Sequence, residues 1–316
     1  MAIGIGDDAA AWQASRSHRS VITTDALVDG VHFLASKMTA AQIGHRAMAA
    51  NLSDVAAMGA RPVLATVALG VAPATDEAWI LELYRAMAGL AGGAGAIIVG
   101  GDLTRAPVAT IVITIVGEVS PRRLKTRGGG RPGDVLAATG PFGGSRAGLE
   151  VLRHDPSVDP AARSAALACF AAPAPRVREG RWLAASTSVR AMMDCSDGLS
   201  TDTGRLARAS GCGAVLERVP VHPAAAVVAR AAGADPLDYA LSGGEDFELL
   251  IAVKARAFDH LAAAFSRRFL RPLERLGHLV AEPGLWLDLE PTGKRELPAS
   301  GWDHLAGGAD AVSRLA

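Results

Sequence analysis

Acidic residues gather at five turns of this 316-residue chain, and their setting points to chemistry on metal ions and phosphate groups. In each turn an apolar run breaks into acids, usually beside small residues, at positions 3–8, 21–25, 97–102, 192–198 and 240–246. Asp54 adds a carboxylate on a predicted helix. Few Lys or Arg residues stand beside these acids, so ion pairing alone would leave much negative charge unbalanced. Mg²⁺ is a natural complement, because it takes carboxylate and hydroxyl oxygens and is completed by substrate phosphates.

The ordinary explanation of any single turn is structural, since Asp and Gly are common turn residues after a strand. Five such acidic turns, in a chain of which only 20% is charged, favour a metal and phosphate site instead. The carboxyl ends of strands are also where α/β folds bind ligands.

A glycine-rich segment at 127–134, with the sequence Arg-Gly-Gly-Gly-Arg-Pro-Gly-Asp, offers backbone amides and guanidinium groups to an anion. A flexible linker fits the same composition equally well. The chain contains no GxxxxGK[ST] phosphate loop, no GxSxG elbow and no HExxH helix. Phosphates are therefore expected to be held by something other than a P-loop.

Strands and helices must position these turns. Short β-branched runs alternate with Ala-rich stretches along the chain, which is typical of a mixed α and β protein. Strands are predicted at 21–24, 96–99, 109–116, 135–138, 191–193 and 249–253. Helices are predicted at 39–59, 75–90, 145–153, 176–185, 199–209 and 258–269, with Thr39 and Thr75 as N-caps of the first two. No element is predicted between 155 and 175. The segment 120–134, rich in Arg, Gly and Pro, predicts a domain boundary, with domains at 1–122 and 123–316.

Composition narrows the class of protein. The 32 Lys and Arg residues balance 32 Asp and Glu residues, so the chain lacks the basic surface expected of a nucleic-acid binder. The 3 cysteines are an odd number and form no CxxC pair, which argues against a disulfide framework or a structural zinc site. No apolar stretch reaches the roughly 20 residues of a membrane span, and no signal peptide is recognised. We expect a cytoplasmic protein that binds neither membrane nor nucleic acid.

Taken in order, several segments resemble the thiamine-monophosphate kinase family, within the superfamily of aminoimidazole ribonucleotide synthetase. They are GIGDDAA (4–10), TTDALVDGVHF (23–33), NLSDVAAMGARP (51–62), GGDLTRAP (100–107), RGGGRPGD (127–134), DCSDGL (194–199), SGGEDFELL (242–250) and GWDHL (301–305). Each is weak alone, but the ordered set spans nearly the whole chain. The resemblance implies an α+β fold of two domains, a mixed α/β N-terminal domain that forms a homodimer and a C-terminal α/β domain that closes the site.

The same resemblance implies ATP-dependent phosphorylation of thiamine monophosphate to thiamine diphosphate, with several Mg²⁺ ions. By matching positions, the metal ligands would be Asp8, Thr23, Thr24, Asp25, Asp54, Asp102, Asp194 and Asp197. The residues contacting ATP would be Tyr84, Gly101, Arg127 and Ser196. Those facing the thiamine phosphate would be His32, Glu245 and Trp302. Outside the motif, His32 would more often be a structural histidine, and Trp302 a core or surface residue.

Two alternatives are kept. The first alternative is another ATP-using member of the same superfamily. A selenophosphate synthetase would carry a reactive Cys in an early segment, and no Cys precedes Cys169 in this chain. A hydrogenase-maturation member would end in Cys, whereas this sequence ends in Ala316. The second alternative is a non-catalytic nucleotide-binding protein on this fold. Retention of so many acids argues against it, because clustered carboxylates repel one another.

Overall fold

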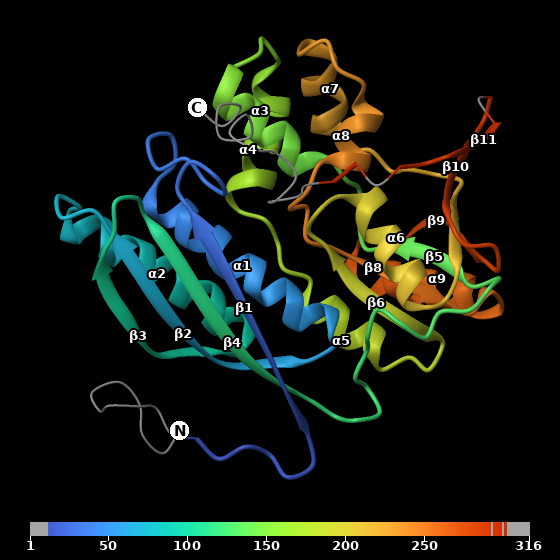
Figure 1. Ribbon diagram of the computed structural model, residues 1–316, viewed down its shortest axis with the longest axis horizontal. Helices are drawn as coiled ribbons and strands as arrows, with labels where there is room; N and C mark the ends of the chain where they lie inside the picture. The colour runs from blue at the N-terminus through green and yellow to red at the C-terminus, as the bar shows by residue number, and fades with distance from the viewer. Residues whose placement is uncertain (1–11, 292, 299, 302–316) are drawn as a thin grey trace.

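The computed structural model describes residues 12–291, 293–298 and 300–301, and its first β-sheet contains four strands (Figure 1). They lie in the order β1-β4-β2-β3, and their bounds are β1 Arg19–Val28, β2 Arg61–Val71, β3 Ile97–Arg105 and β4 Thr110–Val119. Strand β4 runs antiparallel to both β1 and β2, whereas β3 runs parallel to β2. The sequence predicted three of these strands but not β2, because Pro62 at its start looked like the end of a helix.

Helices α1 (Ala40–Ala57) and α2 (Glu77–Ala94) cover one face of this sheet (Figure 1). Thr39 caps α1 as predicted, in a capping box with Gln42. The prediction for α2 was wrong by one residue: Asp76, rather than Thr75, is the N-cap and accepts a hydrogen bond from the amide of Ala78 at 3.0 Å. A carboxylate there also interacts favourably with the helix dipole.

Helix α1 is buried on nearly every side because it lies between the first sheet and the C-terminal half of the chain. Its Ala and Gly residues allow close neighbours: a Cβ on Gly44 would stand 2.4 Å from the carbonyl oxygen of Leu83 in α2. One hydrophobic core therefore contains Ile43 and Met48 of α1 together with Ile251 of the second sheet. The helix thereby holds residues from both halves in fixed relation.

The second sheet has seven strands in the order β11-β10-β7-β9-β5-β8-β6. Their bounds are β5 Val135–Ala138, β6 Val189–Cys195, β7 Gly213–Leu216, β8 Glu248–Val253, β9 Glu274–Val280, β10 Leu285–Leu289 and β11 Gly293–Glu296. Among these strands, as far as the structure describes the chain, only β7 and β10 pair in parallel. Strand β5 has its predicted bounds, and β6 and β8 extend the predicted strands by a few residues. The other four were not predicted, since their runs are short or interrupted.

The remaining helices belong to the C-terminal half. Their bounds are α3 Gly144–His154, α4 Pro160–Ala171, α5 Val177–Ala184, α6 Leu199–Ala209, α7 Pro223–Ala231, α8 Pro236–Ser242, a 3₁₀ turn η1 at Ala255–Ala257, and α9 Phe258–Phe269. Helices α3, α4, α7 and α8 form a group to one side of the sheet (Figure 1). Helices α6 and α9 have their predicted bounds. Helix α4 occupies the segment in which no element was predicted, and it packs with α3 and α7 around Val151, Ala166 and Val228.

The two sheets lie within 19–119 and 135–296, on either side of the Gly- and Arg-rich segment. The domain limits 1–122 and 123–316 stay a prediction. No helix in the described part of the chain is long and apolar enough to cross a membrane.

Candidate active site

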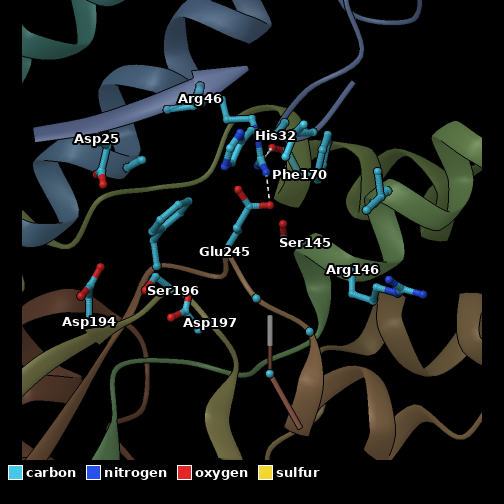
Figure 2. Close-up of a pocket in the computed structure, with 18 of the residues that line it drawn as sticks. Asp25, His32, Arg46, Ser145, Arg146, Phe170, Asp194, Ser196, Asp197 and Glu245 are labelled. Carbon is cyan, nitrogen blue, oxygen red and sulfur yellow. Dashed lines mark hydrogen bonds and ion pairs between the residues drawn. The ribbon is translucent and has the colours of Figure 1, made fainter. Parts of the chain in front are cut away.

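A cavity of about 620 Å³ lies where β1 and α1 face the turns that follow β6 and α8 (Figure 2). Its volume is within the roughly 300–1,000 Å³ typical of small-molecule sites. It collects residues from five of the motif segments found in the sequence, namely 23–33, 51–62, 194–199, 242–250 and 301–305. Of the predicted site residues, those that line it are Thr24, Asp25, His32, Asp54, Asp194, Ser196, Asp197 and Glu245.

Helix α1 connects the two sheets at this cavity through adjacent polar side chains. Asp54 accepts a short hydrogen bond from the Thr23 hydroxyl on β1. Ser53 donates its hydroxyl hydrogen to Oδ2 of Asp194 on β6, at 2.8 Å. Residues far apart in the sequence therefore share one cluster because α1 lies between their strands.

Burial and mutual repulsion raise the pKa values of these carboxyl groups. Desolvation, followed by the charge of Asp54, raises the pKa of Asp25 to about 6 and that of Asp194 to about 7. Burial also raises the pKa of Asp54 itself, against the lowering effect of its hydrogen bond from Thr23. The side chains around this cluster thus do not fully stabilise its negative charge. A bound divalent cation would reduce the repulsion between the carboxylates.

The oxygen ligands of this cluster fit Mg²⁺ if water and substrate phosphates supply the rest of its coordination shell. In the described ranges, no three Asp, Glu, His or Cys side chains are arranged to hold a metal ion by themselves. Mg²⁺ is usually bound by one or two carboxylates, with waters and substrate phosphates completing its shell. Asp25, Asp54 and Asp194, with the hydroxyl of Thr23 beside Asp54, match that requirement, whereas the Thr24 hydroxyl is hydrogen-bonded to that of Thr114 at 2.8 Å on the other face of the strand.

The turn after β6 is built around a buried acid that the sequence reading missed. Oδ2 of Asp202 accepts hydrogen bonds from the amides of Ser196 at 3.0 Å and Asp197 at 2.9 Å. Arg205 then pairs with both Asp202 and Asp197. Gly198 completes the turn with φ of 111°, in the left-handed region that favours glycine. These contacts fix Ser196 and Asp197 at the cavity wall.

Glu245 points into the cavity from the loop after α8, toward Arg46 (Figure 2). Its backbone has φ of 65°, uncommon for a non-glycine residue, and its amide donates to the carbonyl of Ser196 at 2.7 Å. Arg46 forms an ion pair with its carboxylate. His32 lines the same end of the cavity, where its Nδ1 accepts from the amide of Val28 at 3.1 Å.

Not all predicted site residues line this cavity. Arg127 lies near enough for its charge to lower the pKa of Asp54. Tyr84 and Asp102 lie near each other on α2 and β3, where burial and the Asp102 charge raise the pKa of Tyr84. Gly101 is required by packing, since a Cβ there would stand 1.9 Å from the carbonyl oxygen of Val67. None of Arg127, Tyr84, Asp102 and Gly101 lines the cavity, and their roles stay predictions.

Asp8 and Trp302 lie outside the described residues. Conversely, the cavity includes side chains that the sequence reading did not select, among them Arg46, Ser145, Arg146, Phe170 and Tyr239. Arg46 carried a recognisable sign, because it is a charged residue inside an otherwise mainly apolar helix. Phe170 and Tyr239 carried none, since single aromatics are ordinary core residues.

Comparison with known proteins identifies the family to which both parts of this chain belong. Residues 6–119 match the family described as AIR synthase related protein, N-terminal domain, and residues 131–289 match the corresponding C-terminal domain. The cavity-lining residues other than Ser300 and Gly301 lie within these two matched ranges, and the chain is an AIR synthase related protein. The α+β, two-domain fold class expected from the sequence is confirmed.

Individual relatives narrow the class. The chain is 39% identical over 298 residues to the thiamine-monophosphate kinase of Rhodopirellula baltica, covering 90% of this chain and 86% of the relative. The crystal structure of thiamine-monophosphate kinase from Stenotrophomonas maltophilia has a TM-score of 0.82 at 32% identity, over 90% of each chain. AaThiL complexed with AMPPCP and TMP has a TM-score of 0.80 at 26% identity, over 93% of this chain and 89% of that one. The chain belongs to the thiamine-monophosphate kinase family.

Proposed function

We propose that this chain phosphorylates thiamine monophosphate with ATP and releases thiamine diphosphate and ADP. The observation that carries the proposal is the cluster of Asp25, Asp54 and Asp194, whose raised pKa values call for cations, in a cavity large enough for a small molecule. The relatives support it by name, and one similar structure is complexed with TMP and with AMPPCP, an ATP analogue.

The reaction is a direct in-line transfer. A terminal phosphate oxygen of thiamine monophosphate forms a bond to the γ-phosphorus of ATP, the bond from that phosphorus to the β,γ-bridging oxygen breaks, and ADP leaves with the electron pair. Such a transfer depends mainly on positioning and on neutralisation of charge. The attacking oxygen is already anionic near neutral pH, so no Ser-His or Cys-His pair is needed.

The chain's residues divide between the two substrates. In this proposal Ser196 and Arg127 contact ATP, which is supported by the position of Ser196 in the cavity wall and by the nearness of Arg127 to Asp54. In the same proposal, His32 and Glu245, which also line the cavity, face the thiamine phosphate. Tyr84 and Gly101 complete the set of residues proposed to contact ATP, and Trp302 completes the set proposed to face the thiamine phosphate.

The proposed metal ligands are Asp8, Thr23, Thr24, Asp25, Asp54, Asp102, Asp194 and Asp197. Mg²⁺ bound there would neutralise phosphate charge and align the two substrates. Asp197 is held by Arg205 in this structure. Its carboxylate therefore already has a cationic partner, which distinguishes it from Asp25 and Asp194.

A non-catalytic nucleotide binder is the second candidate, and the carboxylate cluster argues against it. A protein that only binds nucleotide has no need to keep three partly or fully buried acids whose pKa values are raised by burial and neighbouring charges. Membership of the thiamine-monophosphate kinase family also favours the enzyme.

The test is incubation of the purified protein with ATP, Mg²⁺ and thiamine monophosphate, with chromatography of the thiamine products. We expect thiamine diphosphate to accumulate with one ADP for each molecule formed. Binding of ATP without formation of the diphosphate would overturn the kinase and favour the binder. Replacing thiamine monophosphate by thiamine serves as the control, because thiamine offers no phosphate oxygen for the attack.

We also propose that the protein is a homodimer in the cytoplasm. An apolar row crosses the face of the first sheet opposite α1, with Ile22, Val116, Leu64 and Ile97 directly paired across the four strands. Ile22 is 72% exposed and Ile97 is 53% exposed, so this row is open at both ends. Leu64 and Val116 between them are already buried within the chain, so the support for an interface between two copies comes from the exposed apolar ends of the row.

A further inference from the structure

A second, shallower pocket of about 280 Å³ lies at the other end of strand β6 from the active site. It is lined by Gly129, Arg131, Arg190 and Lys254. Arg190 stands near the start of β6, and Asp194 four residues further along, so the two sites are separated by about 13 Å of extended strand. The pocket is therefore distinct from the cavity that holds the carboxylate cluster.

The charges around this pocket are unbalanced. Within the described residues, the one carboxylate ion-paired with these cations is that of Asp134, 3.4 Å from Nε of Arg190. The Nε hydrogen is buried and has no hydrogen-bond acceptor. Arg131 and Lys254 form no ion pair in the described part of the chain. The pocket is thus lined by three cationic side chains, of which only Arg190 has an ion-paired carboxylate in the described ranges, and this excess of positive charge is what an anion would balance.

Lys125 strengthens the positive potential from behind the pocket. Its ammonium group donates to the carbonyls of Val189 at 2.6 Å and Ser186 at 3.1 Å, so it is fixed in place. Burial, and then the charge of Lys254, lowers the pKa of Lys125, so the two ammonium groups repel each other electrostatically. Four cationic side chains thus surround or underlie a pocket with a single acidic partner.

The loop that forms the rim is held rigidly in place. Gly129 has φ of 113°, and a Cβ there would stand 2.9 Å from the carbonyl oxygen of Arg190, so the close contact with β6 requires glycine. Gly130 donates its amide hydrogen to the hydroxyl of Ser210 at 3.1 Å. The glycine-rich segment therefore has two sides: Arg127 faces the carboxylate cluster, whereas Arg131 faces this second pocket.

We propose that Arg131, Arg190 and Lys254 form a second binding site for a small multiply charged oxyanion of the phosphate class. The volume is below the roughly 300–1,000 Å³ of pockets for drug-sized ligands, so it fits inorganic phosphate or diphosphate, or the phosphate tail of a nucleotide. Guanidinium groups favour such anions, because their planar donors match phosphate oxygens.

The test is calorimetric titration of the full-length protein in EDTA with inorganic phosphate, with diphosphate and with ATP. Without metal, the carboxylate cluster repels these anions, so the second pocket is measured alone. We expect one anion per chain, with diphosphate binding more tightly than phosphate. In the double variant Arg131→Gln/Lys254→Gln, which removes two exposed or half-exposed cations, we expect affinity to fall by about tenfold or more.

The matched control is Arg267→Gln/Arg268→Gln, which removes two exposed cations from the end of α9. It should leave the affinity unchanged. Equal binding by all three proteins, or no binding by the unaltered protein, would overturn the proposal. ATP binding much more tightly than diphosphate would identify a nucleotide as the source, and equal affinities would identify the free anion. Because no turnover is measured, the outcome is independent of the proposed kinase activity.

Discussion

Arg46 and Glu245, 199 residues apart in the sequence, form an ion pair that closes one end of the active-site cavity. The Arg46 side chain is fully buried, whereas that of Glu245 is 32% exposed. The guanidinium also donates to the carbonyls of His32 at 2.9 Å and Phe170 at 2.6 Å, and it stacks 3.8 Å from the centroid of the Phe170 ring. One side chain of α1 therefore holds three segments of the cavity wall together.

Substitution Arg46→Lys should weaken the binding of thiamine monophosphate more than that of ATP. Lysine keeps the charge but lacks the planar fork, so it cannot hold Glu245 and both carbonyls at once. We expect KM for thiamine monophosphate to rise by about tenfold, corresponding to about 1.4 kcal/mol, with a smaller change in KM for ATP. Steady-state kinetics with each substrate varied in turn provides the measurement.

The control is Arg163→Lys, in an ion pair with Asp155 whose side chains are 40% and 71% exposed. Exposed pairs contribute about 0–1 kcal/mol, so this variant should behave like the unaltered protein. Equal increases in both KM values for Arg46→Lys, accompanied by a matching loss of thermal stability, would mean that the residue has only a structural role.

Substitution Asp54→Asn should abolish turnover while preserving the fold. Asp54 is the acid whose charge contributes to the raised pKa values of both Asp25 and Asp194. Removing it should therefore leave the melting temperature in EDTA unchanged or raise it, because repulsion is relieved. Activity and thermal melts of the same preparation test this. The control is Asp259→Asn on α9, which should retain normal turnover. Near-normal turnover by Asp54→Asn would contradict the assignment of Asp54 as a metal ligand.

Metal-free protein should lose stability as the pH rises from about 4 to 7. The pKa of Asp25 is raised to about 6, and those of Asp194 and Asp246 to about 7, mainly by burial. Each group then binds more protons when folded than when unfolded, so raising the pH through this window favours unfolding. Urea unfolding in EDTA at several pH values measures the effect. Adding Mg²⁺ should reduce it, and a rise in stability over this window would contradict the prediction.

The sequence predicted elements best where caps and periodicity agreed. Thr39 placed the start of α1, and the bounds of α6 and α9 were found because each has a clear apolar face between polar ends. Strand β2 was missed because Pro62 stands near its start, although the strand continues for eleven residues. Helix α4 was missed because its Ala-rich sequence has little amphipathic pattern.

Four of the cavity-lining acids were predicted from their turns (Asp25, Asp194, Asp197 and Glu245) and Asp54 from its helix, whereas Asp238 and the contacts that assemble the cluster were not predicted. Ser53 meets Asp194 only because α1 packs against both sheets, and nothing local in either segment encodes that contact. Arg46 similarly depends on segments far along the chain. Short motifs therefore located the acidic turns, whereas tertiary packing determined which side chains support them.

Substitution Glu248→Gln should destabilise the fold without acting through substrate. The buried carboxylate accepts from Arg176 at 2.6 Å and Arg271 at 2.8 Å, and its pKa is lowered by Arg176 and the other donors despite burial. Removing its charge leaves two guanidinium groups without their partner, and breaking a buried pair costs about 3–5 kcal/mol. Urea unfolding at pH 7 provides the measurement.

Glu274→Gln, at a surface pair in which Arg218 is 65% exposed, is the control and should change stability by about 0–1 kcal/mol. A Glu248→Gln variant that unfolds at the same urea concentration as this control would contradict the argument. It would mean that the two arginines find other acceptors or water at no net loss of stability.

Substitution Ile22→Asp should convert the proposed dimer to a monomer. Ile22 is 72% exposed at the end of the apolar row on the first sheet, and a carboxylate there would be desolvated by a second copy of the chain. Light scattering during size-exclusion chromatography should give twice the chain mass of 32.4 kDa for the unaltered protein and the single-chain mass for the variant. Leu270→Asp is the control: this residue is 91% exposed after α9, away from the row, and its φ of 55° is tolerated by Asp. A variant that stays dimeric would place the interface elsewhere, and a monomeric unaltered protein would refute the dimer.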